Sequence, residues 1–304
     1  MTEVPATIAP PLSKRATFVR RLSSTVLLWG VVLAALFTPH RAVADVCFIG
    51  LILLLGGAGL IEFYGLIEKR GLVCFKRWGT AGGVLLLGGT FACLSGWRGP
   101  QNVLGQANDF ETGFLALFVL GLCVRQLVSK SNPAGLTAIS TTLFGLMYVG
   151  WLLSFVQRIH FYPEANGRLF LIYFVLVSKC SDTGAYVVGS LIGRHKMIPR
   201  ISPGKTWEGF AGALLASTVA SVVFVMLAQG RLVGMNSGHA VILGVLLGVS
   251  AVVGDLIESL LKREAGVKDS GRLFPGIGGI LDLLDSILFN APLMYFYLRH
   301  VLAN

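Results

Sequence analysis

Residues 239–260 read HAVILGVLLGVSAVVGDLIESL, an apolar stretch whose only carboxylates, Asp255 and Glu258, lie near its end. A helix needs about 20 mostly apolar residues to cross the roughly 30 Å hydrocarbon core of a bilayer, and this stretch is long enough. Similar stretches recur along the chain, at 22–38, 46–66, 80–97, 112–128, 136–156, 168–192, 209–229 and 280–298. The sequence therefore predicts an all-α, polytopic membrane helix bundle with about nine transmembrane helices.

The composition of the whole chain agrees with a bilayer environment. Of the 304 residues, 54% are hydrophobic and 13% are charged, whereas a soluble domain carries about 25% charged residues. The net charge of +10 comes from short clusters between the apolar stretches, which suits loops that face anionic headgroups. No nucleic-acid module is visible, so nucleic acid is not an expected partner. The five cysteines have no CxxC spacing and are predicted to be small buried hydrophobic residues.

The placement of Lys and Arg predicts the topology. If residues 1–21 form a cytoplasmic basic tail, most basic residues fall in inside segments, as the positive-inside rule requires. The few predicted outside are Arg41, Arg98, Arg158, Arg168, Arg231 and Arg299. The expected protein is a multi-pass protein of the inner (cytoplasmic) membrane, with its C-terminus outside and the polar loops 193–208 and 261–279 both in the cytoplasm. We divide it into the tail, N-terminal membrane helices over 22–160 and C-terminal membrane helices over 161–304.

Ionisable side chains within apolar helices are costly and mark candidate functional sites. Asp282 and Asp285 are three residues apart and share one helix face, at the membrane surface where the stretch carrying Asp255 ends. Carboxylates that converge in this way suit a hard cation such as Mg²⁺. The alternative is that they interact with a helix N-terminus or pair with Lys262 and Lys268. Lys179 and Asp182 lie within a further apolar stretch, 168–192.

The 193–208 loop combines four cations with hydroxyl side chains and turn-forming Pro and Gly residues. Such a segment can hold a polyphosphate through Lys and Arg, hydroxyls and backbone N–H groups. The alternative is a positive-inside loop without a ligand. It is not a Walker A loop, because the GxxxxGK[ST] pattern is absent, and His195 alone is a weak signal.

Two groups of motifs carry a resemblance to a known family. The first group reads Ser259-x-Leu261-Lys262-Arg263, Lys268-Asp269-Ser270-Gly271, Phe274-Pro275-Gly276, Gly278-Gly279-Ile280-x-Asp282 and Asp285-Ser286. The second reads Asp182-Thr183-Gly184-Ala185-Tyr186, Gly189, Gly193, Ser202-Pro203 and Lys205-Thr206-Trp207-Glu208-Gly209. In this order and spacing, they resemble the signature of phosphatidate cytidylyltransferases (CDP-diacylglycerol synthases). Glu258 lies outside the matched motif.

The resemblance implies that 161–304 is the catalytic part and that CTP and phosphatidate, drawn from the membrane lipids, give CDP-diacylglycerol and pyrophosphate. It implies Mg²⁺ as cofactor, with room for a second cation such as K⁺, and leaves a homodimer open. The implied catalytic residues are Asp255, Asp282, Asp285, Lys268 and Asp269, of which Asp255, Asp282 and Asp285 would hold the metal. The implied substrate-binding residues are Asp182, Ser202, Lys205, Thr206, Ser259, Lys262 and Arg263.

The chain departs from the family pattern at three positions. Ile277 replaces the usual His, Leu283 the usual Arg, and Gly204 a frequent second Lys. These changes bear on substrate preference, and two other functions stay open. One is a related membrane enzyme, such as a CTP-dependent lipid kinase or a cytidylyltransferase for another lipid phosphate. The other is a non-catalytic membrane protein or transporter, although a transporter favours titratable groups near mid-bilayer in both halves.

Overall fold

The predicted apolar stretches form helices in the computed structural model, which describes residues 40–96, 99, 101–129, 134–163, 165–271 and 278–303. The helices are α2 (Arg41–Lys69), α3 (Lys76–Leu94), α4 (Val103–Val128), α5 (Gly135–Gly145), α6 (Leu152–His160), α7 (Gly167–Ile192), α8 (Trp207–Ala228), α9 (Ser237–Glu264) and α10 (Ile280–Tyr297). A π-helical turn, η1 (Leu146–Trp151), joins α5 to α6, and η2 (Leu298–Leu302) extends α10. The predicted tail 1–21 and span 22–38 lie outside the described residues.

The protein is a polytopic membrane helix bundle. Within the described ranges, seven helices are long and apolar enough to cross a bilayer. They correspond to α2, α4, the continuous α5–α6 helix, α7, α8, α9 and α10 with η2. The helix α3 is not among them, because Lys76, Arg77 and its glycines lower its mean hydropathy. All five cysteines are free, but only Cys93 is buried; Cys47 and Cys123 are exposed, contrary to the prediction.

Two of the helices that extend further than predicted carry charges that neutralise each other in the added turns. The helix α4 begins at Val103 rather than near 112, and α6 continues to His160 rather than ending near 156. The added turns hold Glu111 and Arg158, whose side chains form an ion pair of 2.9 Å and are 4% and 3% exposed. Arg158, predicted to lie in an outside segment between two helices, lies within α6 instead. A buried charge is tolerated when it is paired, and hydropathy along one stretch cannot reveal the partner.

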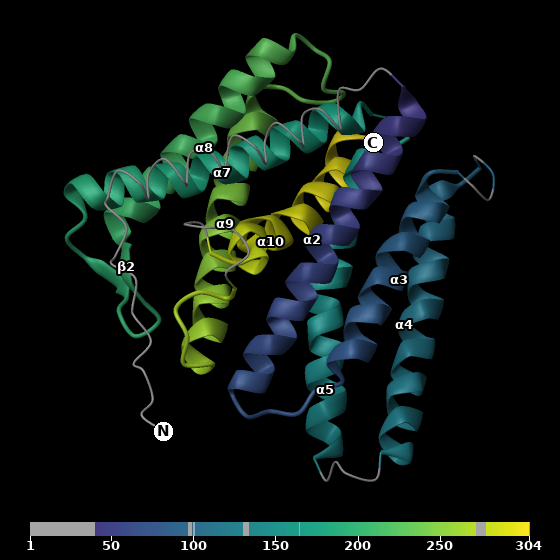
Figure 1. Cartoon of the computed structure of the whole chain (residues 1–304). Coiled ribbons are helices and arrows are strands. Elements are labelled where there is room, and N and C mark those ends of the chain that lie inside the picture. The colour runs from purple at the N-terminus through teal and green to yellow at the C-terminus, as the bar shows by residue number, and fades with distance from the viewer. Residues whose placement is uncertain are drawn as a thin grey trace, which may run out of the picture.

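The helices form two groups with α10 between them. Figure 1 shows α3, α4 and α5 on one side and α7 and α8 on the other. The helix α10 contacts α2 and α6 from the N-terminal half of the chain and α7 and α9 from the C-terminal half. Glycines allow close backbone approach within the second group. A Cβ at Gly244 on α9 would lie 2.5 Å from the Thr218 Cα on α8, and one at Gly189 on α7 would lie 3.5 Å from the Gly209 Cα. Small residues at these positions thus let the helix backbones approach one another, as in many membrane bundles.

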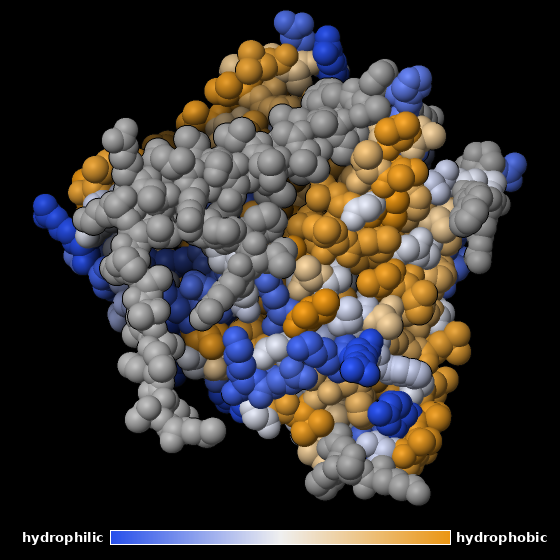
Figure 2. Space-filling view, in the orientation of Figure 1, coloured by the Kyte–Doolittle hydropathy of each residue, from blue (hydrophilic) through white to orange (hydrophobic). Residues whose placement is uncertain are grey.

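The 193–208 loop contains a short β-hairpin that the sequence did not predict. Strand β1 (Lys196–Ile198) pairs antiparallel with β2 (Ser202–Thr206), and β2 leads directly into α8. The hairpin lies at the end of the bundle where α9 ends, and Arg263 at the end of α9 donates from Nε to the Ile201 carbonyl at 3.1 Å (Figure 1). Hydrophilic residues gather near this end in Figure 2, beside a broad apolar surface.

Candidate active site

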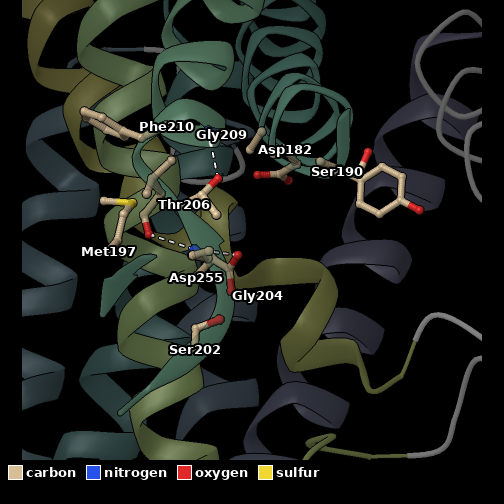
Figure 3. A pocket seen from close by; sticks show the side chains of 14 residues that line it. Asp182, Ser190, Met197, Ser202, Gly204, Thr206, Gly209, Phe210 and Asp255 are labelled. Atoms are coloured by element: carbon tan, nitrogen blue, oxygen red, sulfur yellow. Dashed lines mark hydrogen bonds and ion pairs between the residues drawn. The ribbon is translucent and has the colours of Figure 1, made fainter. Parts of the chain in front are cut away.

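A cavity of about 410 Å³ opens between α7, the hairpin, the start of α8 and α9. Five residues that the sequence singled out line it together: Asp182, Ser202, Lys205, Thr206 and Asp255 (Figure 3). The other lining residues are small or apolar, namely Ala185, Tyr186, Gly189, Ser190, Met197, Gly204, Gly209, Phe210 and Val252. The cavity therefore has polar groups that converge from three separate segments of the chain and an apolar wall, as small-molecule sites commonly do.

The hairpin and the helix cap beside it position Lys205. Thr206 is the N-cap of α8, and its Oγ1 accepts a hydrogen bond of 3.1 Å from the Gly209 N–H, which fixes the end of β2. From this position the Lys205 Nζ lies 2.7 Å from the Asp255 Oδ2 and donates to the Val252 carbonyl at 3.3 Å (Figure 3). The contact brings α9 and the hairpin to the same wall of the cavity.

Three carboxylates form a compact cluster next to this wall. Oxygen atoms of Asp255, Glu258 and Asp285 lie within 4.8 Å of one another, and Glu258 and Asp285 are buried. We call these three residues the carboxylate triad. The Oε1 atom of Glu258 is buried and has no hydrogen-bond partner among the described residues. A buried oxygen without a donor is unusual, and three carboxylates at this spacing provide the oxygen ligands that a hard divalent cation takes. The triad could therefore hold a metal ion.

Each carboxylate of the triad has a lysine near it. Besides the Lys205–Asp255 pair, the Lys262 Nζ lies 2.7 Å from the Glu258 Oε2, and the Lys179 Nζ lies 4.0 Å from the Asp285 Oδ1. Lys179 also reaches three other oxygens: the Asp182 Oδ2 at 3.1 Å, the Ser286 Oγ at 2.9 Å and the Leu283 carbonyl at 3.1 Å. These lysines come from β2, α9 and α7, so three elements converge on the cluster.

Asp282, expected as a metal ligand, lies outside the triad. Its Oδ1 forms an ion pair of 2.5 Å with Lys262. Its Oδ2 accepts hydrogen bonds from the Gly279 N–H at 2.7 Å and from the Ser270 Oγ at 2.8 Å. These contacts are those of the alternative stated above, in which the carboxylate caps the start of α10 and pairs with a lysine.

The remaining predicted residues lie around the site. Ser259 donates from Oγ to the Asp255 Oδ1 at 3.3 Å and so supports the triad. Arg263 is exposed and holds the hairpin turn. Lys268 and Asp269 are exposed, do not line the cavity, and have no hydrogen bond or ion pair with any other residue of the described part of the chain.

Two glutamates that are not among the predicted site residues lie beside them in the structure. Glu258 lies one turn from both Asp255 and Lys262 on α9, so its spacing was a usable signal. Glu62, on α2 in the N-terminal half, accepts hydrogen bonds at its Oε2 from the Leu281 N–H at 2.9 Å and the Ser270 Oγ at 3.2 Å. Nothing in the local sequence pattern identifies these partners of Glu62, because they come from a distant part of the chain.

Comparison with known proteins gives consistent matches. A family model described as the cytidylyltransferase family matches residues 19–301. A phosphatidate cytidylyltransferase of Bacillus subtilis (strain 168) is 32% identical over 272 residues, covering 90% of this chain and 96% of the relative. A protein of the same name from Mycobacterium bovis is 36% identical over 214 residues, covering 68% of this chain and 67% of the relative. An uncharacterized protein of Escherichia coli (strain K12), YnbB, is 36% identical over 211 residues, covering 67% of this chain and 70% of the relative.

Proposed function

Because this chain belongs to the cytidylyltransferase family, we propose that it transfers CMP from CTP to phosphatidate, giving CDP-diacylglycerol and pyrophosphate. The single observation that carries the proposal is the carboxylate triad with its three lysines beside a cavity at one end of the bundle. A reaction between two phosphate-bearing molecules needs several cationic groups to offset the negative charge, and otherwise mainly correct positioning of the reactants. The three lysines, and a cation held by the carboxylate triad, would supply these positive charges beside the cavity.

The proposed chemistry is an in-line displacement at phosphorus. A phosphatidate oxygen attacks the α-phosphorus of CTP, a new P–O bond forms, and the bond from the α-phosphorus to the bridging oxygen breaks, so that pyrophosphate leaves with that electron pair. The attacking phosphate is already an anion, so no strong base is required. The main obstacle is repulsion between the two anions, which cationic side chains at the site reduce.

We assign the carboxylate triad as the Mg²⁺ site. The fit rests on the spacing of its oxygens and on the unpartnered, buried Glu258 Oε1. When bound there, Mg²⁺ would neutralise phosphate charge and stabilise the leaving pyrophosphate. Asp282 then acts on the site through Lys262, which it shares with Glu258.

The side chains around the cavity have separate roles in the proposal. Lys205 binds the polyphosphate, and Ser202 and Thr206 line the same wall. Lys179 keeps Asp182 and Asp285 in place from α7. Arg263 and Lys268, both exposed at this end of the bundle, are available to phosphates that arrive from solvent or from the headgroup region.

The cavity supports a lipid acceptor as well as a nucleotide. Tyr186, on the outer surface of α7, is 75% exposed and forms part of the cavity lining. A lipid phosphate can thus reach the site from the bilayer side while its acyl chains stay in the membrane. We place this end of the bundle in the cytoplasm, where the positive-inside bias puts the 193–208 and 261–279 loops and where CTP is available.

A second candidate is a cytidylyltransferase that uses another lipid phosphate. The observation in its favour is Gly204, which lines the cavity at the position where the family often has a second lysine. Without that cation the pocket has more space and less charge for the acceptor.

The test is to incubate the purified protein in lipid nanodiscs with CTP and Mg²⁺, together with phosphatidate, lysophosphatidate or a polyprenyl phosphate. Mass spectrometry then identifies any CDP-lipid. We expect CDP-diacylglycerol from phosphatidate and none from the Asp285→Asn variant. Product from another lipid phosphate alone selects the second candidate, and no CDP-lipid from any acceptor would overturn both.

A further inference from the structure

The three lysines of the site differ in what else holds them. Lys179 has a second carboxylate partner, Asp182, and Lys262 has Asp282, both outside the carboxylate triad. Lys205 is different, because Asp255 is its only carboxylate partner within the described ranges. Lys205 also lines the cavity, whereas Lys179 and Lys262 do not. Of the three, Lys205 can therefore leave the triad at the least cost and has a space into which to move.

The Lys205–Asp255 ion pair occupies the binding group of each ligand in the present arrangement. Lys205 is 19% exposed and Asp255 is 37% exposed, and the ammonium of Lys205 neutralises this carboxylate. A divalent cation that entered alone would compete with the Lys205 ammonium for Asp255 and would leave Lys205 without a carboxylate partner. A triphosphate that entered alone would find Lys205 already engaged. Either ligand alone therefore breaks the Lys205–Asp255 ion pair and leaves one charge of that pair without a partner, which is costly in a partly buried site.

We propose that Lys205 is an exchangeable counter-ion that couples cation binding to polyphosphate binding. In the ligand-free site it neutralises Asp255. When a polyphosphate occupies the cavity, Lys205 moves to the phosphate and frees Asp255 for the cation. The two ligands therefore bind with positive coupling, and each raises the affinity for the other by the same factor. This inference rests on the proposed function, since it takes the polyphosphate of CTP as the ligand of the cavity.

The coupling can be measured without turnover. Equilibrium dialysis with Mn²⁺ as the probe gives the metal bound by the detergent-purified protein, with or without a CTP analogue that carries a non-cleavable methylene bridge between its α and β phosphorus atoms. Placing equal analogue on both sides of the membrane cancels the Mn²⁺ that it binds in solution. For the wild-type protein we expect the analogue to tighten Mn²⁺ binding within the range of about 5- to 150-fold that is typical of coupled sites.

Variants of Lys205 separate the exchange from a structural effect. Lys205→Met removes the competing ammonium, so Mn²⁺ alone should bind more tightly than to the wild type, and the analogue should add little. Lys205→Arg keeps the charge and should restore weak binding of Mn²⁺ alone. Lys196→Met is the matched control, because Lys196 is exposed on β1 of the same hairpin and has no ion pair with another described residue. Its Mn²⁺ binding should equal that of the wild type.

The outcomes distinguish this inference from the proposed function. If Mn²⁺ binds the wild type equally well with and without the analogue, or if Lys205→Met binds Mn²⁺ no more tightly than the wild type, the exchange is wrong. Formation of CDP-lipid by the same preparation would then leave the proposed function standing. Conversely, if the analogue tightens Mn²⁺ binding but no lipid phosphate gives a CDP-lipid, the Lys205 exchange stands and the proposed function is wrong.

Discussion

The carboxylate of Glu62 on α2 accepts a hydrogen bond of 2.9 Å from the Leu281 N–H at the start of α10, across 219 positions of sequence. The same oxygen accepts from the Ser270 hydroxyl at 3.2 Å. The first turn of a helix has N–H groups without partners inside the helix, and a carboxylate satisfies one of them while interacting favourably with the helix dipole. Glu62 thus fixes the segment before α10 to the N-terminal half of the bundle.

We expect Glu62→Ala to destabilise the protein. An unsatisfied buried N–H costs about 1–3 kcal/mol, so the midpoint of thermal unfolding in detergent should fall, and turnover should drop because the Ser270 contact is lost as well. Glu68→Ala is the matched control on the same helix, since Glu68 is half exposed and its ion-pair partner among the described residues is Lys76 at the surface. Equal effects of the two substitutions would show that Glu62 does not hold α10.

The carboxylate triad predicts that Glu258 is as important as Asp255 and Asp285. Glu258→Gln keeps the shape of the side chain but removes the charge that holds a hard cation. Turnover of phosphatidate should fall at least about 100-fold, since charge stabilisation by a bound metal contributes several kcal/mol. Glu264→Gln is the control, because Glu264 lies at the end of the same helix and pairs with Arg70 at the surface. Near-wild-type turnover with Glu258→Gln would exclude the triad as the metal site.

Asp282 and Asp285 should differ in how their replacement affects the metal. Asp282 contacts Lys262, Gly279 and Ser270 and is not one of the three carboxylates of the triad. Asp282→Asn should therefore lower turnover without changing the Mg²⁺ concentration that gives half-maximal rate. Asp285→Asn should raise that concentration. Titration of activity with Mg²⁺ measures both, and a large shift for Asp282→Asn would place Asp282 among the ligands.

The ion pair between Glu111 and Arg158 predicts a large effect on stability far from the site. Both side chains are buried, and Arg158 also donates to the Asn108 Oδ1 at 2.7 Å. Glu111→Gln leaves an unpaired buried charge and should cost about 3–5 kcal/mol of unfolding free energy, whereas the double replacement Glu111→Gln with Arg158→Met should cost less. Thermal unfolding of the three proteins checks this. A double variant that is less stable than Glu111→Gln would contradict it.

The sequence predicts the helices and part of the site, but not the pairing of side chains between helices. Apolar length alone located the described helices, because the bilayer sets the length of a span. Motif spacing singled out Lys205 and Asp285, and the cost of a carboxylate within an apolar stretch singled out Asp255. Helical spacing gives the residues that share a face, but it does not give the neighbours that other helices bring. The pairing of Glu111 with Arg158 and of Asp282 with Lys262 depends on such neighbours, so it required the structure.

The most direct test of the proposed function follows the phosphorus atoms of CTP. Purified protein in nanodiscs is given phosphatidate, Mg²⁺ and CTP labelled with ³²P at either the α or the γ position, and the lipid fraction is separated and counted. CMP transfer predicts that α-label enters the lipid and that γ-label is released as pyrophosphate. Label from the γ position in the lipid would identify a CTP-dependent lipid kinase instead, and lipid without label from either position would contradict catalysis on phosphatidate.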